Sequence, residues 1–184
     1  MAVLQMSLPK VLHDTNSTAI NGKEAGQAFQ AVEKEMATNG IHCDIKKALL
    51  SRLDIFRQNR TRFAFTDYSP VFNMLSGKRQ NKRDYGTTYL FYNTRREVAF
   101  YDKEVEEAIR MRKDERYISP SNLIRAEARL LRKQSINNAG LLTVDSLIQD
   151  YEEAVQAVYK KEMAGVLRNG GGIDGQLCLA LNGI

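Results

Sequence analysis

The stretch VAFYDK at residues 98–103 reads as a short β-strand, and the fold prediction starts from it. Apolar and aromatic residues favour an extended chain, and side chains on a strand alternate between its two faces. Tyr101 and Lys103 are therefore expected on one face, roughly 7 Å apart along the strand. A phenol beside a cation is suited to nucleophilic attack on a phosphodiester. An amphipathic strand with a half-buried tyrosine would show the same six residues.

Two other segments alternate in the same way. Residues 49–58 and residues 123–131 switch between apolar and polar side chains, which predicts two further strands. Their polar faces carry Asp54 in the first segment, and Arg125, Glu127 and Arg129 in the second. If these strands are neighbours of the strand at 98–103, one sheet face is apolar and the other collects carboxylates, a tyrosine and cations. A solvated face would show the same alternation.

The remaining segments predict a hairpin and several helices. Two β-rich runs, 87–92 and 97–102, flank the turn sequence NTRR. Helices are predicted at 22–38, which ends at Asn39-Gly40, at a short segment opened by Ser69-Pro70, at 103–113, and after Thr143, with a break near Asp150. Residues 2–12 read as an opening strand and residues 77–84 as a polar loop.

These elements predict an α+β fold with an antiparallel or mixed sheet. Helices are expected on one face of the sheet, and an open, polar, DNA-binding face on the other. A length of 184 residues suits one domain with a real core. We expect a single domain over residues 1–168 and a C-terminal tail over 169–184.

Positive charge is concentrated in the middle of the chain. Residues 46–133 hold 21 of the 27 Lys and Arg but only 11 of the 22 Asp and Glu, a net charge of +10. The two ends together hold the remaining 6 cations and 11 acids, a net charge of −5. Such a concentration favours a surface that neutralises phosphates, with a solvated charged surface as the alternative.

Composition argues against several other classes of protein. No apolar run approaches the length of a membrane span, and the start of the chain lacks the pattern of a signal peptide. Cys43 and Cys178 lie far apart with no metal-binding spacing, so neither a disulfide framework nor a zinc site is predicted. We expect a cytoplasmic protein with no membrane partner.

The polar side chains suggest a specific chemistry. A free tyrosine with a pKa near 10 is about 0.1% phenolate at neutral pH, so it needs a base, a cation or a metal to react. Asp54 and Glu127 offer hard oxygen ligands of the kind that Mg²⁺ or Mn²⁺ prefers. A metal there would polarise the scissile phosphate, and Lys103 could stabilise the phenolate or the pentavalent phosphate.

Three motifs, taken in order, resemble the signature of rolling-circle replication initiators. They are SRLD at 51–54, GTTYL at 86–90 leading to FYDK at 100–103, and IRAEARL at 124–130. The nearest relatives by resemblance are the gene II nicking proteins of filamentous phages and related plasmid initiators. The resemblance covers roughly residues 50–135. His13 and His42 stand alone, so the His-hydrophobic-His metal motif common in the wider nickase class is absent.

The resemblance implies a DNA replication initiator that cuts and rejoins one strand at an origin. Its tyrosine stays attached to the 5′-phosphate, the free 3′-hydroxyl primes synthesis, and a reverse transfer closes the circle. Carried over, Tyr101 is the nucleophile with Lys103 beside it, and Asp54 and Glu127 are the metal ligands. The implied partners are single-stranded or supercoiled origin DNA and the helicase and polymerase of a bacterial host. The oligomeric state is not predicted.

Cationic side chains give the candidate DNA contacts. They are Arg52, Lys78, Arg79, Lys82, Arg83, Arg95, Arg96, Arg125 and Arg129. Arg52, Arg125 and Arg129 either contact phosphate or pair with the nearby carboxylates. Tyr85, Tyr89 and Tyr92 either stack on bases or pack in the sheet. The alternative functions are a non-catalytic DNA-binding or regulatory relative of such an initiator and, from a different class, an RNA-binding or structural protein.

Overall fold

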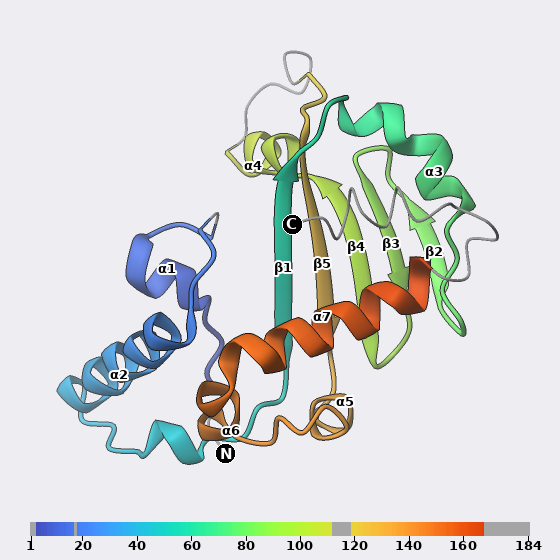
Figure 1. Ribbon diagram of the computed structural model, residues 1–184. Helices are drawn as coiled ribbons and strands as arrows, with labels where there is room; N and C mark the ends of the chain where they lie inside the picture. The colour runs from blue at the N-terminus through green and yellow to red at the C-terminus, as the bar shows by residue number, and fades with distance from the viewer. Residues whose placement is uncertain (1–2, 17, 112–118, 168–184) are drawn as a thin grey trace. The chain divides into compact units, whose positions relative to one another are not determined.

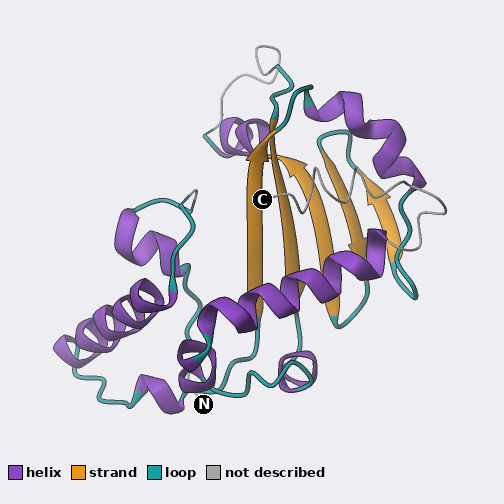
Figure 2. Cartoon of the chain, viewed as in Figure 1, coloured by secondary structure: helices purple, strands orange, loops and turns teal. Residues whose placement is uncertain are grey.

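A computed structural model of the chain describes residues 3–16, 18–111 and 119–167. The predicted tail over 169–184 lies outside these residues. Figure 2 distinguishes the helices from the strands. In chain order the elements, with η for 3₁₀ helices, are α1 (Leu8–His13), α2 (Gly22–Thr38), η1 (Ile45–Lys47), β1 (Leu53–Arg60), η2 (Phe65–Tyr68), α3 (Ser69–Met74), β2 (Asn81–Asp84), β3 (Thr88–Tyr92), β4 (Arg96–Asp102), α4 (Lys103–Arg110), β5 (Leu123–Leu130), α5 (Lys133–Asn137), α6 (Val144–Gln149) and α7 (Tyr151–Leu167).

The chain divides into two compact units. The first, a helical unit, comprises Met1–Ser51 and Lys133–Ala157, and the second, a sheet unit, comprises Arg52–Arg132 and Val158–Ile184. The boundary falls inside α7. The prediction of one nicking domain over residues 1–168 stays a prediction.

The helical unit is organised around α2. Asn21 and Glu24 form a reciprocal capping box at its N-terminus, which satisfies backbone N–H groups that a helix leaves unpaired. Ala25, Ala28 and Phe29 form its buried face. Thr143 caps α6 in the same manner, and residue 150 interrupts the helix before α7 begins, as predicted.

The sheet unit contains a five-stranded antiparallel sheet in the order β1-β5-β4-β3-β2. Each neighbouring pair is antiparallel, so the predicted α+β class is confirmed and the sheet is not mixed. The predicted hairpin is the β3–β4 pair, in which Tyr92 lies opposite Glu97. β5 lies between β1 and β4 and so joins β1 to the hairpin, which brings together strands that are distant in sequence (Figure 1).

One face of this sheet builds the core. Phe72 of α3 stacks against Tyr89 and Phe100, with ring centroids 5.0 and 5.2 Å apart. Such aromatic pairs contribute about 0.5–1.5 kcal/mol each beyond the area that they bury. Residues 158–167 of α7 lie against the same face (Figure 1). There the guanidinium carbon of Arg57 lies 5.1 Å from the centre of the Tyr159 ring.

Two predictions about elements were wrong. Residues 8–13 form a helix rather than part of an opening strand, because Pro9 sits in the first turn, where its fixed φ suits a helix and its missing N–H costs nothing. Residues 81–84, predicted as loop, form the edge strand β2. Its sequence NKRD carries no apolar alternation, and backbone pairing with β3 holds it in the sheet. Within the described residues, no helix is long and apolar enough to cross a membrane.

Candidate active site

The strand register brings the predicted polar residues onto one face of the sheet. Directly opposed residues of antiparallel strands point to the same side. Asp54 lies opposite Arg129, Tyr101 lies opposite Arg125, and Ala99 separates Tyr101 from Glu97 on β4. We call this side the polar face and define it by Asp54, Gln58, Glu97, Tyr101, Arg125, Glu127 and Arg129.

A hydrogen bond joins Tyr101 to Glu127 at the centre of the polar face. The Tyr101 hydroxyl donates to Glu127 Oε2 over 2.9 Å. Arg129 Nη2 donates to the same oxygen over 3.0 Å, while its Nη1 donates to Glu97 Oε2, also over 3.0 Å. Arg129 therefore fixes two carboxylates, one of which holds the tyrosine.

Burial and charge set the acidity of this pair. Burial raises the pKa of the Tyr101 phenol, and the negative charge of Glu127 raises it further, against an opposing effect of Arg125. Burial alone would raise the pKa of Glu127, but the hydrogen bond and the positive charge of Arg129 outweigh it, so this pKa lies below its ordinary value. At neutral pH the site holds a protonated phenol and an ionised carboxylate.

Arg125 is held beside the tyrosine by its own neighbours. Its side chain is buried, its guanidinium carbon lies 4.0 Å from the centre of the Phe56 ring, and Nη2 donates to Gln58 Oε1 over 2.6 Å. A planar guanidinium stacked on a ring loses little further freedom when it binds. Arg125 therefore supplies a preoriented positive charge next to Tyr101.

Asp54 reaches the polar face at its edge. The Arg52 guanidinium binds this carboxylate in a bidentate arrangement: Nε donates to Oδ1 over 2.9 Å, and Nη2 donates to Oδ2 over 2.8 Å. Asp54 also lies opposite Arg129 in the strand register. The structure thus brings Asp54 to the same face as Tyr101 and Glu127, where it is paired with an arginine.

Lys103 does not lie on the strand with Tyr101, contrary to the sequence prediction. β4 ends at Asp102, whose side chain accepts the backbone N–H of Val105 and so caps α4. Lys103 is the first residue of that helix, and its buried amino group contacts Glu106 at 2.5 Å and Glu107 at 3.1 Å. The capping aspartate changes the chain from extended to helical one residue before the lysine, so the strand alternation stops there.

The carboxylates of the polar face do not form a metal site as they stand. In the described part of the chain, no three His, Cys, Asp or Glu side chains converge closely enough to hold a metal ion. Arg52 engages Asp54, and Arg129 engages Glu97 and Glu127. Arginine cations thus neutralise the carboxylates that the sequence suggests as ligands of Mg²⁺ or Mn²⁺. The assignment of Asp54 and Glu127 as metal ligands stays a prediction.

The basic residues between β1 and β4 differ in their surroundings. The amino group of Lys82 donates to the Phe72 and Asn73 carbonyls, both over 2.9 Å, and so caps the end of α3. Arg96 pairs with Glu162 over 3.2 Å. Lys78, Arg79 and Arg95 are exposed. Lys82 therefore has a structural role that the sequence did not reveal.

The three tyrosines of the hairpin region occupy different environments. Tyr89 is buried in the core, which agrees with the packing alternative. Tyr92 is half-buried and lies under the Arg83 guanidinium at 4.9 Å, while Tyr85 is 58% exposed. Tyr85 is thus the hairpin tyrosine most accessible to a base.

Sequence reasoning missed Glu97 as a member of the polar face. The signal was present, because residues 97 and 101 share a face on any strand that contains both. Its partner Arg129 lies 32 residues away, and only the pairing of β4 with β5 makes it a neighbour.

Comparison with known proteins adds no family to this description. No protein-family model matches the chain, and neither a curated protein nor a solved structure does.

Proposed function

We propose that the protein is a DNA replication initiator that cuts and rejoins one DNA strand through Tyr101. The observation that carries the proposal is the 2.9 Å hydrogen bond from the Tyr101 hydroxyl to Glu127 on a sheet face that also carries Arg125 and Arg129. A hydroxyl nucleophile, a positioned proton acceptor and fixed cations are the groups that phosphoryl transfer requires. The resemblance of the three strand motifs to rolling-circle initiators supports the same assignment.

The proposed reaction exchanges one phosphodiester for another. The Tyr101 oxygen forms a bond to phosphorus as its proton passes to Glu127, and the bond from phosphorus to the 3′-oxygen of the DNA breaks. The departing 3′-oxygen takes up a proton from solvent and leaves as a hydroxyl. The 5′-phosphotyrosine conserves the bond, so attack by a 3′-hydroxyl reverses the step and rejoins the strand.

The electrostatics suit each group to its part. The lowered pKa of Glu127 keeps the carboxylate ionised at neutral pH, where it accepts the hydrogen bond of the Tyr101 hydroxyl, although the same shift makes it a weaker base. Arg125 and Arg129 are fixed before the substrate arrives, so they stabilise developing charge on phosphate without reorganisation.

The proposal includes the partners and the compartment. The concentration of positive charge in residues 46–133 supports a DNA strand as the ligand. By resemblance, the substrate is single-stranded or supercoiled origin DNA in the cytoplasm of a bacterial host, whose helicase and polymerase extend the cut strand.

A DNA-cutting assay tests the proposal. The natural chain, Tyr101→Phe and Tyr85→Phe are incubated with single-stranded DNA of varied sequence, with and without Mg²⁺ or Mn²⁺, and run on denaturing gels. We expect a protein–DNA adduct with the natural chain and Tyr85→Phe and none with Tyr101→Phe. Equal adduct from both variants would reject Tyr101 as the nucleophile.

A second candidate is a DNA-binding or regulatory relative without catalysis. It is favoured by the burial of Tyr101, which is 8% exposed and has a raised pKa, and by the engagement of Glu127 by Arg129. On this reading the tyrosine–carboxylate pair stabilises the sheet, and DNA binds only through charge. The same assay then gives salt-sensitive binding but no adduct, and a preference for RNA would favour the RNA-binding alternative.

A further inference from the structure

Arg83, Tyr85 and Tyr92 lie together where the sheet ends at β2, and we call them the edge cluster. In the register of the β3–β4 hairpin, Tyr92 lies opposite Glu97, a member of the polar face. Arg83 lies opposite Leu90, two positions from Tyr92 on the same strand. Side chains two positions apart share a face, so Arg83 and Tyr92 both lie on the side of the sheet that carries the polar face.

The guanidinium of Arg83 contacts both tyrosines of the edge cluster. Its carbon lies 4.9 Å from the centre of the Tyr92 ring, and its Nη1 donates to the Tyr85 hydroxyl over 3.4 Å. A planar guanidinium that stacks on a ring loses little further freedom when it binds a ligand. The edge cluster is therefore oriented before a ligand arrives.

The edge cluster is accessible and positively charged. Tyr85 is 58% exposed, Arg83 is exposed and Tyr92 is half-buried. Other arginines of the sheet unit pair with carboxylates, and they are Arg52, Arg60, Arg96 and Arg129. Within the described residues, no carboxylate pairs with Arg83, whose charge is influenced by the two tyrosines instead. A cation and an exposed ring thus stand side by side without an acid between them.

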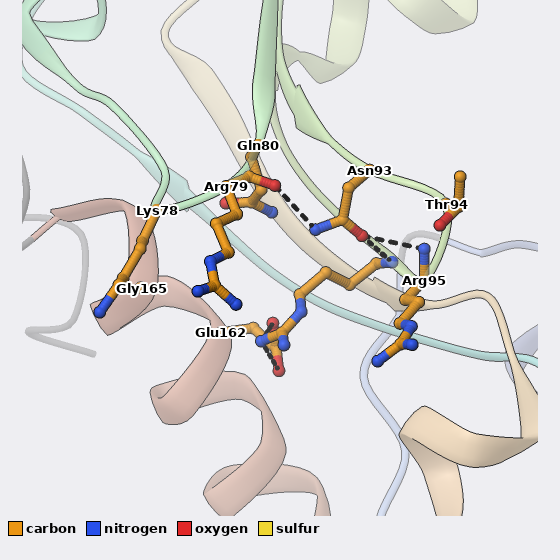
Figure 3. A pocket seen from close by; sticks show the side chains of 9 residues that line it. Lys78, Arg79, Gln80, Asn93, Thr94, Arg95, Glu162 and Gly165 are labelled. Atoms are coloured by element: carbon orange, nitrogen blue, oxygen red, sulfur yellow. Dashed lines mark hydrogen bonds and ion pairs between the residues drawn. The ribbon is translucent and has the colours of Figure 1, made fainter.

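The basic pocket at the turn of the β3–β4 hairpin differs from the edge cluster. Its cations do not meet, because Lys78 and Arg95 extend away from each other (Figure 3). Arg96, which also lines it, pairs with Glu162 over 3.2 Å. Among the described residues, its lining includes no aromatic side chain. The edge cluster, in contrast, combines a cation with rings that it contacts.

The edge cluster lies within reach of a DNA strand bound at Tyr101. Thr88 lies opposite Tyr101 in the register, and the Tyr85 N–H donates to the Thr88 carbonyl over 2.9 Å. Two strand spacings of about 4.8 Å therefore separate the backbone of Tyr85 from that of Tyr101. A strand with the duplex rise of about 3.4 Å per nucleotide covers this distance in about three nucleotides.

We propose that the edge cluster binds an unpaired base of single-stranded DNA by stacking, about three nucleotides from the phosphate at Tyr101. The Tyr85 ring and the Arg83 guanidinium supply the stacking surfaces, and stacking tolerates every base because each has a π-face. A base inside a duplex is already covered by its neighbours, so the edge cluster selects an unpaired strand. The inference rests on the proposed function for its ligand, and it adds a base contact to a site built from a nucleophile and charges.

Binding of two matched oligonucleotides to the full chain tests the edge cluster. The probes are fluorescent single-stranded DNAs of equal length, one with thymine at every position and one abasic throughout, so they differ only in their bases. The parent chain and every variant carry Tyr101→Phe, which prevents the proposed adduct, and fluorescence anisotropy then reports binding alone. We expect Tyr85→Leu to weaken binding of the thymine probe about tenfold, the effect of losing one stacked base, and binding of the abasic probe less than about twofold.

Three further variants serve as controls for stacking. Tyr85→Phe keeps the ring and should bind both probes as the parent chain does. Arg83→Lys keeps the charge but loses the planar group, so it should weaken binding of the thymine probe and spare the abasic probe. Phe63→Leu removes a ring that is 53% exposed and lies under Arg62 at 5.3 Å elsewhere in the sheet unit, and it should bind both probes as the parent chain does.

The outcomes separate the edge cluster from the proposed cutting reaction. Retained binding of the abasic probe shows that the Tyr85→Leu protein is folded. Equal weakening of both probes by Tyr85→Leu, or unchanged binding of the thymine probe, would overturn the inference, and so would a parent chain that does not bind the thymine probe. Because binding is read without the Tyr101 hydroxyl, a missing adduct leaves this test standing, and a failure here leaves the cutting reaction to its own assay.

Discussion

At the scale of single residues, one hydrogen bond shifts two pKa values in opposite directions. Burial is the largest cause of the raised pKa of Tyr101, and the charge of Glu127 adds to it. For Glu127, burial alone would raise the pKa, but the hydrogen bond and the positive charge of Arg129, together with the hydrogen bond from Tyr101, outweigh burial and lower the pKa. The protonated phenol and the ionised carboxylate thus stabilise each other.

The first prediction concerns Glu127→Gln. Removing the negative charge lowers the pKa of Tyr101, while burial keeps it above the ordinary value of 10.0. Ultraviolet difference titration measures this, with Glu127→Gln/Tyr101→Phe subtracted to isolate the one phenol. A Tyr101 pKa equal to that of the natural chain would show that Glu127 does not act on it.

The second prediction concerns stability and acid. The pKa of Glu127 in the folded protein lies below its ordinary value of 4.5. The ionised carboxylate therefore stabilises the fold above the unfolded-state pKa, and this stabilisation is lost as pH falls through the folded-state pKa. At neutral pH, the free energy of unfolding of Glu127→Gln should be about 1–3 kcal/mol lower than that of the natural chain, because Arg129 loses a charged partner. Urea unfolding across a pH series should show this difference shrinking below pH 4.5. A difference that stays constant into acid would contradict the assignment.

At the scale of elements, α4 removes Lys103 from the strand that carries Tyr101. Its amino group is buried, whereas Glu106 and Glu107 are partly exposed and can be hydrated. Removing a partner from a buried charge costs about 3–5 kcal/mol, while replacing the charge itself by an apolar side chain costs far less.

The third prediction follows from this asymmetry. Glu106→Gln/Glu107→Gln should lower the free energy of unfolding by about 3 kcal/mol, and Lys103→Met by about 1 kcal/mol or less. Guanidinium unfolding measures both. The Lys103→Met variant should also form the DNA adduct at the rate of the natural chain. If a folded Lys103→Met protein forms no adduct, Lys103 takes part in the cutting reaction.

Most strands of the sheet could be predicted from the alternation of apolar and polar residues. Which strands lie next to each other could not be predicted in this way. Apolar–polar alternation located β1, β4 and β5 and assigned Asp54, Tyr101 and Glu127 to polar faces. Pairing of β1 with β5 joins segments more than 60 residues apart, which no local pattern specifies. Likewise, the Arg129–Glu97 ion pair depends on the register of β4 with β5. The strand β2 was missed because it carries no apolar alternation and only edge pairing with β3 holds it in the sheet. The position of Lys103 was missed because a helix cap at Asp102 ends the strand alternation before it.

At the scale of the whole molecule, the charge distribution predicts how DNA binding responds to salt. Each phosphate contact to a single strand contributes a slope of about −0.7 in the logarithm of affinity against the logarithm of salt concentration. With about four contacts to exposed cations, the fourth prediction is a slope of about −3 for the full chain. Fluorescence anisotropy over a salt series measures it. Lys78→Gln/Arg79→Gln should reduce the slope by about 1, and salt-independent binding would exclude a phosphate-directed surface.

The most direct test of the central claim is the site of DNA attachment. The natural chain is incubated with single-stranded DNA, the DNA and protein are digested, and mass spectrometry identifies the peptide that retains a nucleotide. The account predicts a nucleotide phosphate on Tyr101. Attachment at another residue, with the exposed Tyr85 as the leading competitor, or no attachment under conditions in which the chain binds DNA, would contradict it.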